Sequence, residues 1–326
     1  MSYAIVAAHA GGPEVLELTE TDVPDPGPGQ LLVKVAASGV NFIETYQRGG
    51  IYPVDFPFTP GSEAAGEVVA AGTGVTGFST GDRVATAEGS ASYAQYMLID
   101  SDKALPVPEG ISDHAAAALP LQGMTAHYLI NSTFEVKAGQ TVLTHAGAGG
   151  VGLLLTQLLK AKGARVITTV SSDEKESLAR KAGADEVLGY EGLLPNINEL
   201  TGGTGVDVVF DGVGKSTFDD SLASLRTRGT LVLFGGASGP VPEFDLQRLN
   251  AGGSLYVTRP KLADYLLDAT ERRWRSTELF NAVLSGDLSV SIGAAYPLAD
   301  AAGAHRDLQA RKTTGKVLLV SDSQAG

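Results

Sequence analysis

A short glycine-rich stretch, GAGGVG, has the residue types and spacing to bind a phosphate group. Gly147, Gly149 and Gly152 follow the pattern G-x-G-x-x-G. The apolar segment TVLTHA (141–146) precedes them, and the apolar segment VGLLLTQLLKAKG (151–163) follows. A strand before the loop and a helix after it are the context that the pattern needs, because the unpaired N–H groups of the helix then face the phosphates. The stretch therefore predicts a dinucleotide cradle, although the spacing alone is a weak signal in a chain with 41 glycines.

Each glycine of this loop has an expected task. Gly147 permits a tight turn, Gly149 lets the backbone approach the pyrophosphate, and Gly152 lets helix and strand pack closely. The alternative is a purely structural turn, which does not explain these spacings between a strand and a helix. We expect the phosphates to lie against the backbone of Gly147, Gly149, Gly150, Val151 and Gly152.

The residues after the next expected strand favour NADPH over NADH. The chain reads SSDEK there, and Ser171, Ser172 and Lys175 lie where NAD enzymes usually carry an acidic residue for the ribose hydroxyls. Hydroxyl groups and an ammonium group suit the extra charge of a 2′-phosphate. Two alternatives stay open: Ser171 as a helix N-cap with Glu174 completing a capping box, and Asp173 as a ribose partner.

The composition excludes several chemistries. The 326 residues include no cysteine, so disulfides, thiolate metal sites and a cysteine nucleophile are impossible. A formal net charge of −13 repels nucleic acid and anionic lipid. No apolar run reaches the ~18 residues of a membrane span, and the N-terminal segment lacks the basic start of a signal peptide. We therefore expect a cytoplasmic protein with neither a nucleic-acid nor a membrane partner.

The elements that must position these residues change in kind near Ser112. Before it, short strands are expected over QLLVKVAASGV (30–40), AAGEVVAAG (64–72), GDRVATA (81–87) and ASYAQYMLID (91–100), with one helix over NFIETYQRG (41–49). Short strands between proline- and glycine-rich turns favour a barrel-like β domain.

After Ser112 strands and helices alternate. A helical segment, which we expect to be broken at Pro120 and Gly123, comes first. Strands are then expected at 141–146, 164–170, 186–190, 206–213 and 229–236, and helices at 151–163, 173–183 and 216–225. This order predicts right-handed crossovers and a doubly wound parallel sheet. Two last strands, 289–298 and 315–320, are expected to rejoin the first domain.

Several segments together resemble quinone oxidoreductases of the zeta-crystallin type, a zinc-free branch of the medium-chain dehydrogenase/reductase superfamily. They are GVNFIETYQRGGIYP (39–53), PGSEAAGEV (60–68), AGGVG with Gln157 and Lys160, YVTRPKLADY (256–265) and HRDLQARKTTGKVLL (305–319). The resemblance spans almost the whole chain, and one departure is Gly147, where the family commonly has alanine. It implies an α/β protein with a GroES-like β-barrel catalytic domain over 1–124 and 262–326 and a Rossmann doubly wound parallel sheet over 125–261.

The resemblance also implies that no metal is bound. Zinc alcohol dehydrogenases of this superfamily use a Cys after the first core strand and a His in a PGHE motif. Here the chain reads GVNF and PGSE, so Asn41 lies near the Cys position and Ser62 takes the His position. Zinc needs at least three good ligands close together, while Glu63 supplies one carboxylate and the five histidines show no paired spacing. We interpret these histidines as core or surface residues.

Individual site residues are implied by the same resemblance. Asn41, Tyr46 and Tyr52 belong to the nicotinamide and substrate end, where amide and phenol groups form hydrogen bonds. The implied cofactor contacts beyond the glycine loop and the SSDEK stretch are Asn41, Thr125, Tyr190, Ser216, Phe234, Gly235, Gly236, Ala237, Val257, Thr258, Arg259 and Arg311. For the two tyrosines the alternative is packing, and for Arg311 it is a solvated helix end.

The predicted activity is metal-free hydride transfer from NADPH to a quinone, because an electron-poor acceptor needs less help from a Lewis acid. The alternatives are reduction of alkenals or enones on the same fold, and a structural, crystallin-like or RNA-binding role for an NADPH-binding protein. The negative charge argues against RNA. The resemblance further implies a small-molecule substrate and a homodimer or tetramer, with segments 230–239 and 254–260 as plausible interface strands.

Overall fold

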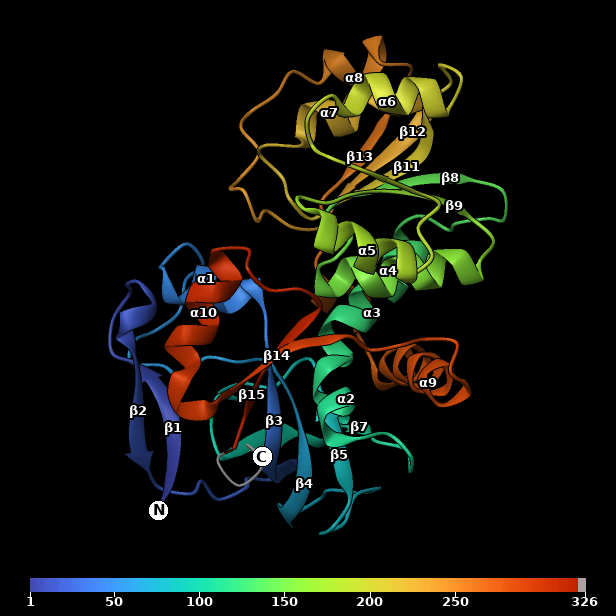
Figure 1. Ribbon diagram of the computed structural model, residues 1–326. Coiled ribbons are helices and arrows are strands. Elements are labelled where there is room, and N and C mark those ends of the chain that lie inside the picture. Colours follow the sequence, from blue (N-terminus) through green and yellow to red (C-terminus); the bar gives the residue numbers. More distant parts are fainter. Residues whose placement is uncertain (322–326) are drawn as a thin grey trace. The chain divides into compact units, whose positions relative to one another are not determined.

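The computed structural model describes residues 1–321. Their contacts divide them into two units: unit 1 comprises Met1–Met124 and the chain from Leu266 onward, and unit 2 comprises Thr125–Tyr265. Each unit has its own β-sheet, which is mainly antiparallel in unit 1 and parallel in unit 2 (Figure 1). Each unit is described by itself below.

The sheet of unit 1 has the order β14-β15-β3-β4-β5-β7, and β6 also pairs with β3. Its strands are β3 (Gln30–Val40), β4 (Glu63–Ala71), β5 (Arg83–Thr86), β6 (Tyr96–Asp100), β7 (Leu105–Pro106), β14 (Ile292–Pro297) and β15 (Lys316–Val320). Two further strands, β1 (Ser2–Ala7) and β2 (Leu16–Thr21), form an antiparallel pair of their own.

The 11-residue strand β3 organises this sheet. One edge of β3 pairs with β4 along most of its length. The other edge is shared, since β6 pairs with its first half and β15 with its second half, where Val317 lies opposite Val40. The C-terminal strands β14 and β15 therefore complete a sheet that begins near the N-terminus, and the start of β15 lies beside the end of β3.

Four helices and several short turns accompany the sheet of unit 1 in the described residues. They are α1 (Phe42–Arg48), α2 (Asp113–Ala118), α9 (Ala269–Ser285) and α10 (Ala301–Gln309), with 3₁₀ turns at Pro13–Val15, Ser101–Lys103, Leu298–Asp300 and, in unit 2, Leu262–Tyr265. Helix α3 (Pro120–Tyr128) contains the unit boundary, and a π-helical turn, Leu129–Thr133, follows it.

One of the two expected helix breaks was wrong. Pro120 does separate two helices, because it is the first residue of α3, where its missing N–H costs nothing. Gly123 lies inside α3 instead of ending it. A Cβ at Gly123 would lie 2.9 Å from Leu119 Cδ1 and 3.2 Å from Leu279 Cδ1, so close packing is the reason for this glycine.

Unit 2 confirms the predicted doubly wound sheet. Its strands run in the order β10-β9-β8-β11-β12-β13, and every neighbouring pair is parallel. The strands are β8 (Thr141–Thr144), β9 (Arg165–Thr169), β10 (Glu186–Leu188), β11 (Val206–Asp211), β12 (Leu225–Leu233) and β13 (Tyr256–Thr258). The strand order reverses between β8 and β11, as in dinucleotide-binding folds.

Helices cover both faces of this sheet (Figure 1). They are α4 (Gly150–Ala161), α5 (Asp173–Lys181), α6 (Leu193–Leu200), α7 (Phe218–Ala223) and α8 (Gln247–Ala251). On one face, buried residues of α6 and α7 such as Ile197 and Leu222 pack on Leu143, Ile167 and Val209 of the strands. The strands are buried on both sides, which explains their nearly continuous apolar sequences.

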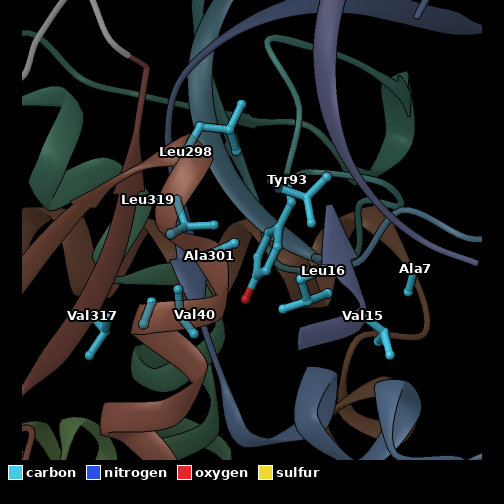
Figure 2. Packing of buried hydrophobic residues seen from close by; sticks show 11 residues of the cluster. Ala7, Val15, Leu16, Val40, Tyr93, Leu298, Ala301, Val317 and Leu319 are labelled. Atoms are coloured by element: carbon cyan, nitrogen blue, oxygen red, sulfur yellow. The ribbon is translucent and has the colours of Figure 1, made fainter. Parts of the chain in front are cut away.

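A buried apolar cluster in unit 1 surrounds one polar side chain. Figure 2 shows Tyr93 among Val40 of β3, Leu319 of β15 and Leu298 of the 3₁₀ turn before α10. Other residues of the cluster come from β1, β2 and α10. The phenol oxygen lies 3.0 Å from Nε2 of the buried His305, and Arg48 Nη1 lies 3.0 Å from His305 Nδ1. A guanidinium only donates, so Nδ1 accepts and Nε2–H donates to Tyr93. Burial, followed by the charge of Arg48, lowers the pKa of His305 to about 3.

This neutral histidine makes folding sensitive to acid. The unfolded chain protonates histidine near pH 6.5, whereas the folded protein does so only near pH 3. The stability that follows from this difference is present in full above about pH 6.5 and is lost as the pH falls from about 6.5 toward 3. We expect the midpoint of urea unfolding to fall less steeply over this range in His305→Gln than in the wild type. His9→Gln, at an exposed site, should keep the wild-type slope, and parallel curves for all three proteins would contradict this account.

Candidate active site

The glycine loop connects β8 to α4 in unit 2. A Cβ at Gly147 would lie 2.2 Å from Thr168 Oγ1, and a Cβ at Gly152 would lie 2.3 Å from the Ala146 carbonyl oxygen. Both positions therefore require glycine for packing. The left-handed residue of the turn is Ala146, with a φ of 56°.

Gly149 differs from the other two glycines. It is the N-cap of α4, and a Cβ there would meet only the Ala146 carbonyl oxygen, at 3.2 Å. The first N–H groups of the 12-residue helix α4, from Gly150 on, have no partner inside the helix. Backbone free of side chains beside an N-terminus with unpaired donors is an arrangement that fits a pyrophosphate.

Two hydroxyl groups and an ammonium group lie together at the carboxyl end of β9. Ser172, rather than Ser171, is the N-cap of α5, because its Oγ accepts a hydrogen bond from the Lys175 N–H at 3.4 Å. The alternative with Ser171 as the cap was therefore wrong. Ser171 Oγ lies 3.4 Å from Lys175 Nζ, and both serines are exposed. Asp173 is exposed in the first turn of α5.

Most of the other predicted contact residues of unit 2 lie in loops after its parallel strands. Tyr190 follows β10 and stacks on His145 with ring centroids 6.1 Å apart. Ser216 follows β11, where its N–H donates to Ser238 Oγ at 3.0 Å. Phe234, Gly235, Gly236 and Ala237 follow β12, Val257 and Thr258 belong to β13, Arg259 follows it, and Thr125 is buried in α3. Carboxyl ends of parallel strands meet at one edge, which is where such folds bind ligands.

Sequence reasoning missed a buried polar chain that ties these strand ends together. Asp211 Oδ1 accepts from the N–H groups of Val213 and Gly214, at 2.8 and 2.9 Å. Its Oδ2 accepts from the hydroxyls of Thr217 and Ser221, both at 2.8 Å. Since Ser221 donates to the carboxylate, its oxygen accepts from Nε2–H of His145, 2.9 Å away. The hydroxyl of Ser221 is thus a buried structural donor that holds the loop after β11 in place.

A second polar cluster lies in unit 1, where β3 ends and α1 begins. Asn41 is only 5% exposed. Its Nδ2 donates to Glu63 Oε2 at 3.0 Å, and its Oδ1 accepts from Lys316 Nζ at 2.7 Å and from Gln122 Nε2 at 3.3 Å. Lys316 Nζ also donates to Glu63 Oε2, and both side chains of this ion pair are buried. The amide of Asn41 is therefore held at both ends.

Lys316, Glu44 and Gln122 are the residues of this cluster that sequence reasoning missed. For Lys316 the available signal was a charged residue at the start of the otherwise apolar segment KVLLV (316–320). Glu44 is fully buried, and its carboxylate accepts from the Asn41 N–H at 2.7 Å and from the Ser62 hydroxyl at 3.1 Å. Burial raises the pKa of Glu44 to about 7, although the nearby Lys316 opposes this shift.

The aromatic residues expected at the substrate end gather on and beside α1. The rings of Tyr46 and Tyr52 meet edge to face with centroids 5.4 Å apart, and Phe42 lies 6.3 Å from Tyr46. Tyr52 is 39% exposed. Arg311 follows α10 with a φ of 58° and is exposed.

Two features are absent from residues 1–321. No group of three or more histidine, aspartate or glutamate side chains in this range is arranged to hold a metal ion. No helix in the same range combines the length and the apolar character needed to cross a membrane.

Comparisons with known proteins agree with the fold and with the class of enzyme. The sequence pattern of the alcohol dehydrogenase GroES-like domain matches residues 27–109, and that of the zinc-binding dehydrogenase matches residues 150–270. The chain is 45% identical to a quinone oxidoreductase of Pseudomonas aeruginosa, over 98% of this chain and 100% of the relative. It is 40% identical to a 2-haloacrylate reductase of a Burkholderia species, over 98% and 99% of the two chains.

A solved structure extends the likeness to three dimensions. The Escherichia coli quinone oxidoreductase in complex with NADPH has a TM-score of 0.96 to this protein and 43% identity, over 98% of this chain and 99% of that chain. The protein is an oxidoreductase with a GroES-like domain and a Rossmann domain. It belongs to the quinone oxidoreductase family of the medium-chain dehydrogenase/reductase superfamily.

Two alanine substitutions in the glycine loop should separate binding from packing. In Gly152→Ala the new Cβ meets backbone, so we expect a lower midpoint of thermal unfolding. In Gly149→Ala we expect nearly wild-type unfolding but a dinucleotide Kd raised by at least about 10-fold, because the methyl group lies where the backbone must approach the phosphates. Cofactor fluorescence titration and thermal unfolding measure the two effects. Equal loss of stability in both variants would contradict the assignment.

Proposed function

We propose that this protein reduces quinones with NADPH by hydride transfer. The observation that supports the acceptor most strongly is the similarity, over its full length, to the Pseudomonas quinone oxidoreductase. The bound cofactor supplies a hydride from its nicotinamide ring, and the protein's task is to bind, orient and shield the reactants.

NADPH is proposed on the residues at the end of β9. The exposed hydroxyls of Ser171 and Ser172 and the ammonium of Lys175 provide donors and a positive charge for a 2′-phosphate. The relative from Escherichia coli was solved with NADPH, which agrees with this choice. The glycine loop and the N-terminus of α4 take the pyrophosphate.

The remaining predicted contacts keep their proposed roles. We assign the adenine and ribose side to Tyr190 and Ser216, the carboxamide to Thr125, and further cofactor contacts to Phe234, Gly235, Gly236, Ala237, Val257, Thr258, Arg259 and Arg311. A homodimer or tetramer is proposed as well, because β13 is an edge strand of its sheet and Tyr256 on it is 62% exposed.

Asn41, Tyr46 and Tyr52 are the proposed groups at the reacting end. Glu63 uses one hydrogen of the Asn41 amide nitrogen, which leaves the second for an acceptor oxygen of the nicotinamide or the substrate. Lys316 and Gln122 hold the amide oxygen, so that the amide keeps this orientation. The phenols of Tyr46 and Tyr52 can donate to oxygen on which negative charge develops.

A second candidate function is the reduction of electron-poor alkenes. The 40% identity to a 2-haloacrylate reductase favours it, and such a reaction uses the same hydride donor. Oxidation of NADPH followed with 1,4-benzoquinone, 9,10-phenanthrenequinone, a 2-alkenal and 2-chloroacrylate separates the two. We expect turnover of the quinones. Turnover of the alkenes alone would replace the quinone assignment, and a lower KM for NADH than for NADPH would refute the cofactor assignment.

Cofactor selectivity provides a prediction for one side chain. Lys175→Ala removes the ammonium group from the proposed 2′-phosphate site, so KM for NADPH should rise roughly 10-fold while KM for NADH stays within about twofold. Steady-state kinetics with both cofactors measure this. Lys181→Ala, on the exposed end of the same helix, is the matched control and should change neither KM. An equal rise of both values in Lys175→Ala would argue against a phosphate contact.

A further inference from the structure

The carboxyl group of Glu44 is buried beside the proposed reacting end without a strong counter-ion of its own. It is the third residue of α1, and its side chain is 0% exposed. Oε2 accepts from the backbone N–H of Asn41 at 2.7 Å, and Oε1 accepts from the hydroxyl of Ser62 at 3.1 Å. Lys316 is the nearby cation, but its ammonium group donates to Glu63 and Asn41.

The surroundings of Glu44 favour a carboxyl group that titrates near neutral pH. The charged and titratable groups facing it are Lys316 from β15, Glu63 from β4 and the phenol of Tyr93, with Arg48 beyond Tyr93. Loss of hydration raises the pKa of Glu44 to about 7, and Glu63 adds to this while Lys316 opposes it. A general acid works best with a pKa near the working pH.

The proton of this buried group has a route to solvent through Ser62. Oε2 is occupied by a backbone N–H, so the proton of the acid form lies on Oε1, which faces the Ser62 hydroxyl. Ser62 is only partly buried, whereas Glu44 is sealed from solvent. The main chain fixes Ser62, since its carbonyl oxygen accepts from the Gly89 N–H at 2.9 Å. A hydroxyl can accept one proton while it donates another.

We propose that Glu44 and Ser62 form the proton donor of the reaction, with Glu44 as the acid and Ser62 as the relay. This inference rests on the proposed quinone reduction. A quinone that has received a hydride is a hydroquinone monoanion and needs one proton on its charged oxygen. The Ser62 O–H bond breaks as that proton moves to the oxyanion, and the Glu44 O–H bond breaks as its proton moves to Ser62 Oγ.

The balance of this step leaves Glu44 as a carboxylate and the product as a neutral hydroquinone. The new carboxylate keeps the Asn41 N–H and the Ser62 hydroxyl as donors and gains attraction from Lys316. After the product leaves, a proton from water returns through Ser62. With an alkene acceptor the same proton would complete the reduced carbon, so the relay serves either substrate class.

Two variants test the relay. Glu44→Gln keeps an acceptor for the Asn41 N–H but has no carboxyl proton. Ser62→Ala keeps the acid but removes the hydroxyl group that relays its proton. In the wild type, kcat with a quinone should fall as pH rises through about 7, because the acid form is lost. Each variant should lower kcat about 100-fold near neutral pH and flatten this profile. The double variant should be no slower than either single one, because both break the same path.

A matched control exists in the same unit. Glu271 is also the third residue of its helix, α9, and its carboxylate accepts from the Leu267 N–H at 3.3 Å. Glu271→Gln should keep the wild-type pH profile even if it unfolds at a lower temperature. Thermal unfolding and the NADPH Kd of Glu44→Gln show whether that variant still folds and binds cofactor. If it does both and keeps the wild-type pH profile, the relay is refuted.

A readout that needs no turnover separates this proposal from the proposed function. Infrared difference spectra between acidic and alkaline samples should show a protonated carboxyl band that titrates near neutral pH in the wild type and in Ser62→Ala. The band should be missing in Glu44→Gln. A titrating band in a protein that reduces no quinone and no alkene refutes the proposed function and the catalytic use of the proton. Turnover without such a band refutes the relay alone.

Discussion

The buried ion pair between Lys316 and Glu63 constrains the rest of unit 1. Charges removed from water must be paired and hydrogen-bonded, and loss of one partner of such a pair typically costs about 3–5 kcal/mol. Lys316 begins β15, Glu63 begins β4, and Asn41 follows β3, so the cluster fastens three neighbouring strands at one point. Strand register and the orientation of the Asn41 amide are therefore set together, and a shift of any strand would separate the charges.

The same cluster links stability to chemistry. Glu63 also accepts from the Leu121 N–H at 2.8 Å, which fixes the start of α3. Glu44 closes the N-terminus of α1 on the other side of Asn41. The result is an amide held by charged neighbours and, beside it, an acid that holds its proton up to about neutral pH. Burial is the shared cause, because it strengthens the ion pair and raises the pKa of the unpaired acid.

In unit 2 a buried chain of hydrogen bonds holds the strand ends, and it consists of neutral groups and one carboxylate. Asp211 takes four hydrogen bonds from the loop that follows β11 and from α7. His145 connects this carboxylate, through Ser221, to Thr169 at the end of β9, where Nδ1 lies 2.9 Å from the threonine hydroxyl. The strand ends that carry the proposed cofactor contacts are thus held by side chains that need not touch the cofactor.

The sequence by itself determined the local features of this protein. Apolar strands, helix periods and glycine spacing are short-range patterns, so they predicted β8, the glycine loop, α4 and the doubly wound order of unit 2. The family resemblance of the motifs GVNF and PGSE pointed to Asn41 as a site residue and to Ser62 only as the residue in place of a zinc ligand. The tertiary structure alone decided which distant residues meet. Lys316 lies 253 residues from Glu63, and no local pattern encodes their pairing. Gly123 was predicted to break a helix because the residue that requires a glycine there, Leu279, lies far along the chain and no local pattern indicates their contact. Burial, which gives Glu44 and His305 their unusual pKa values, exists only once the chain has folded.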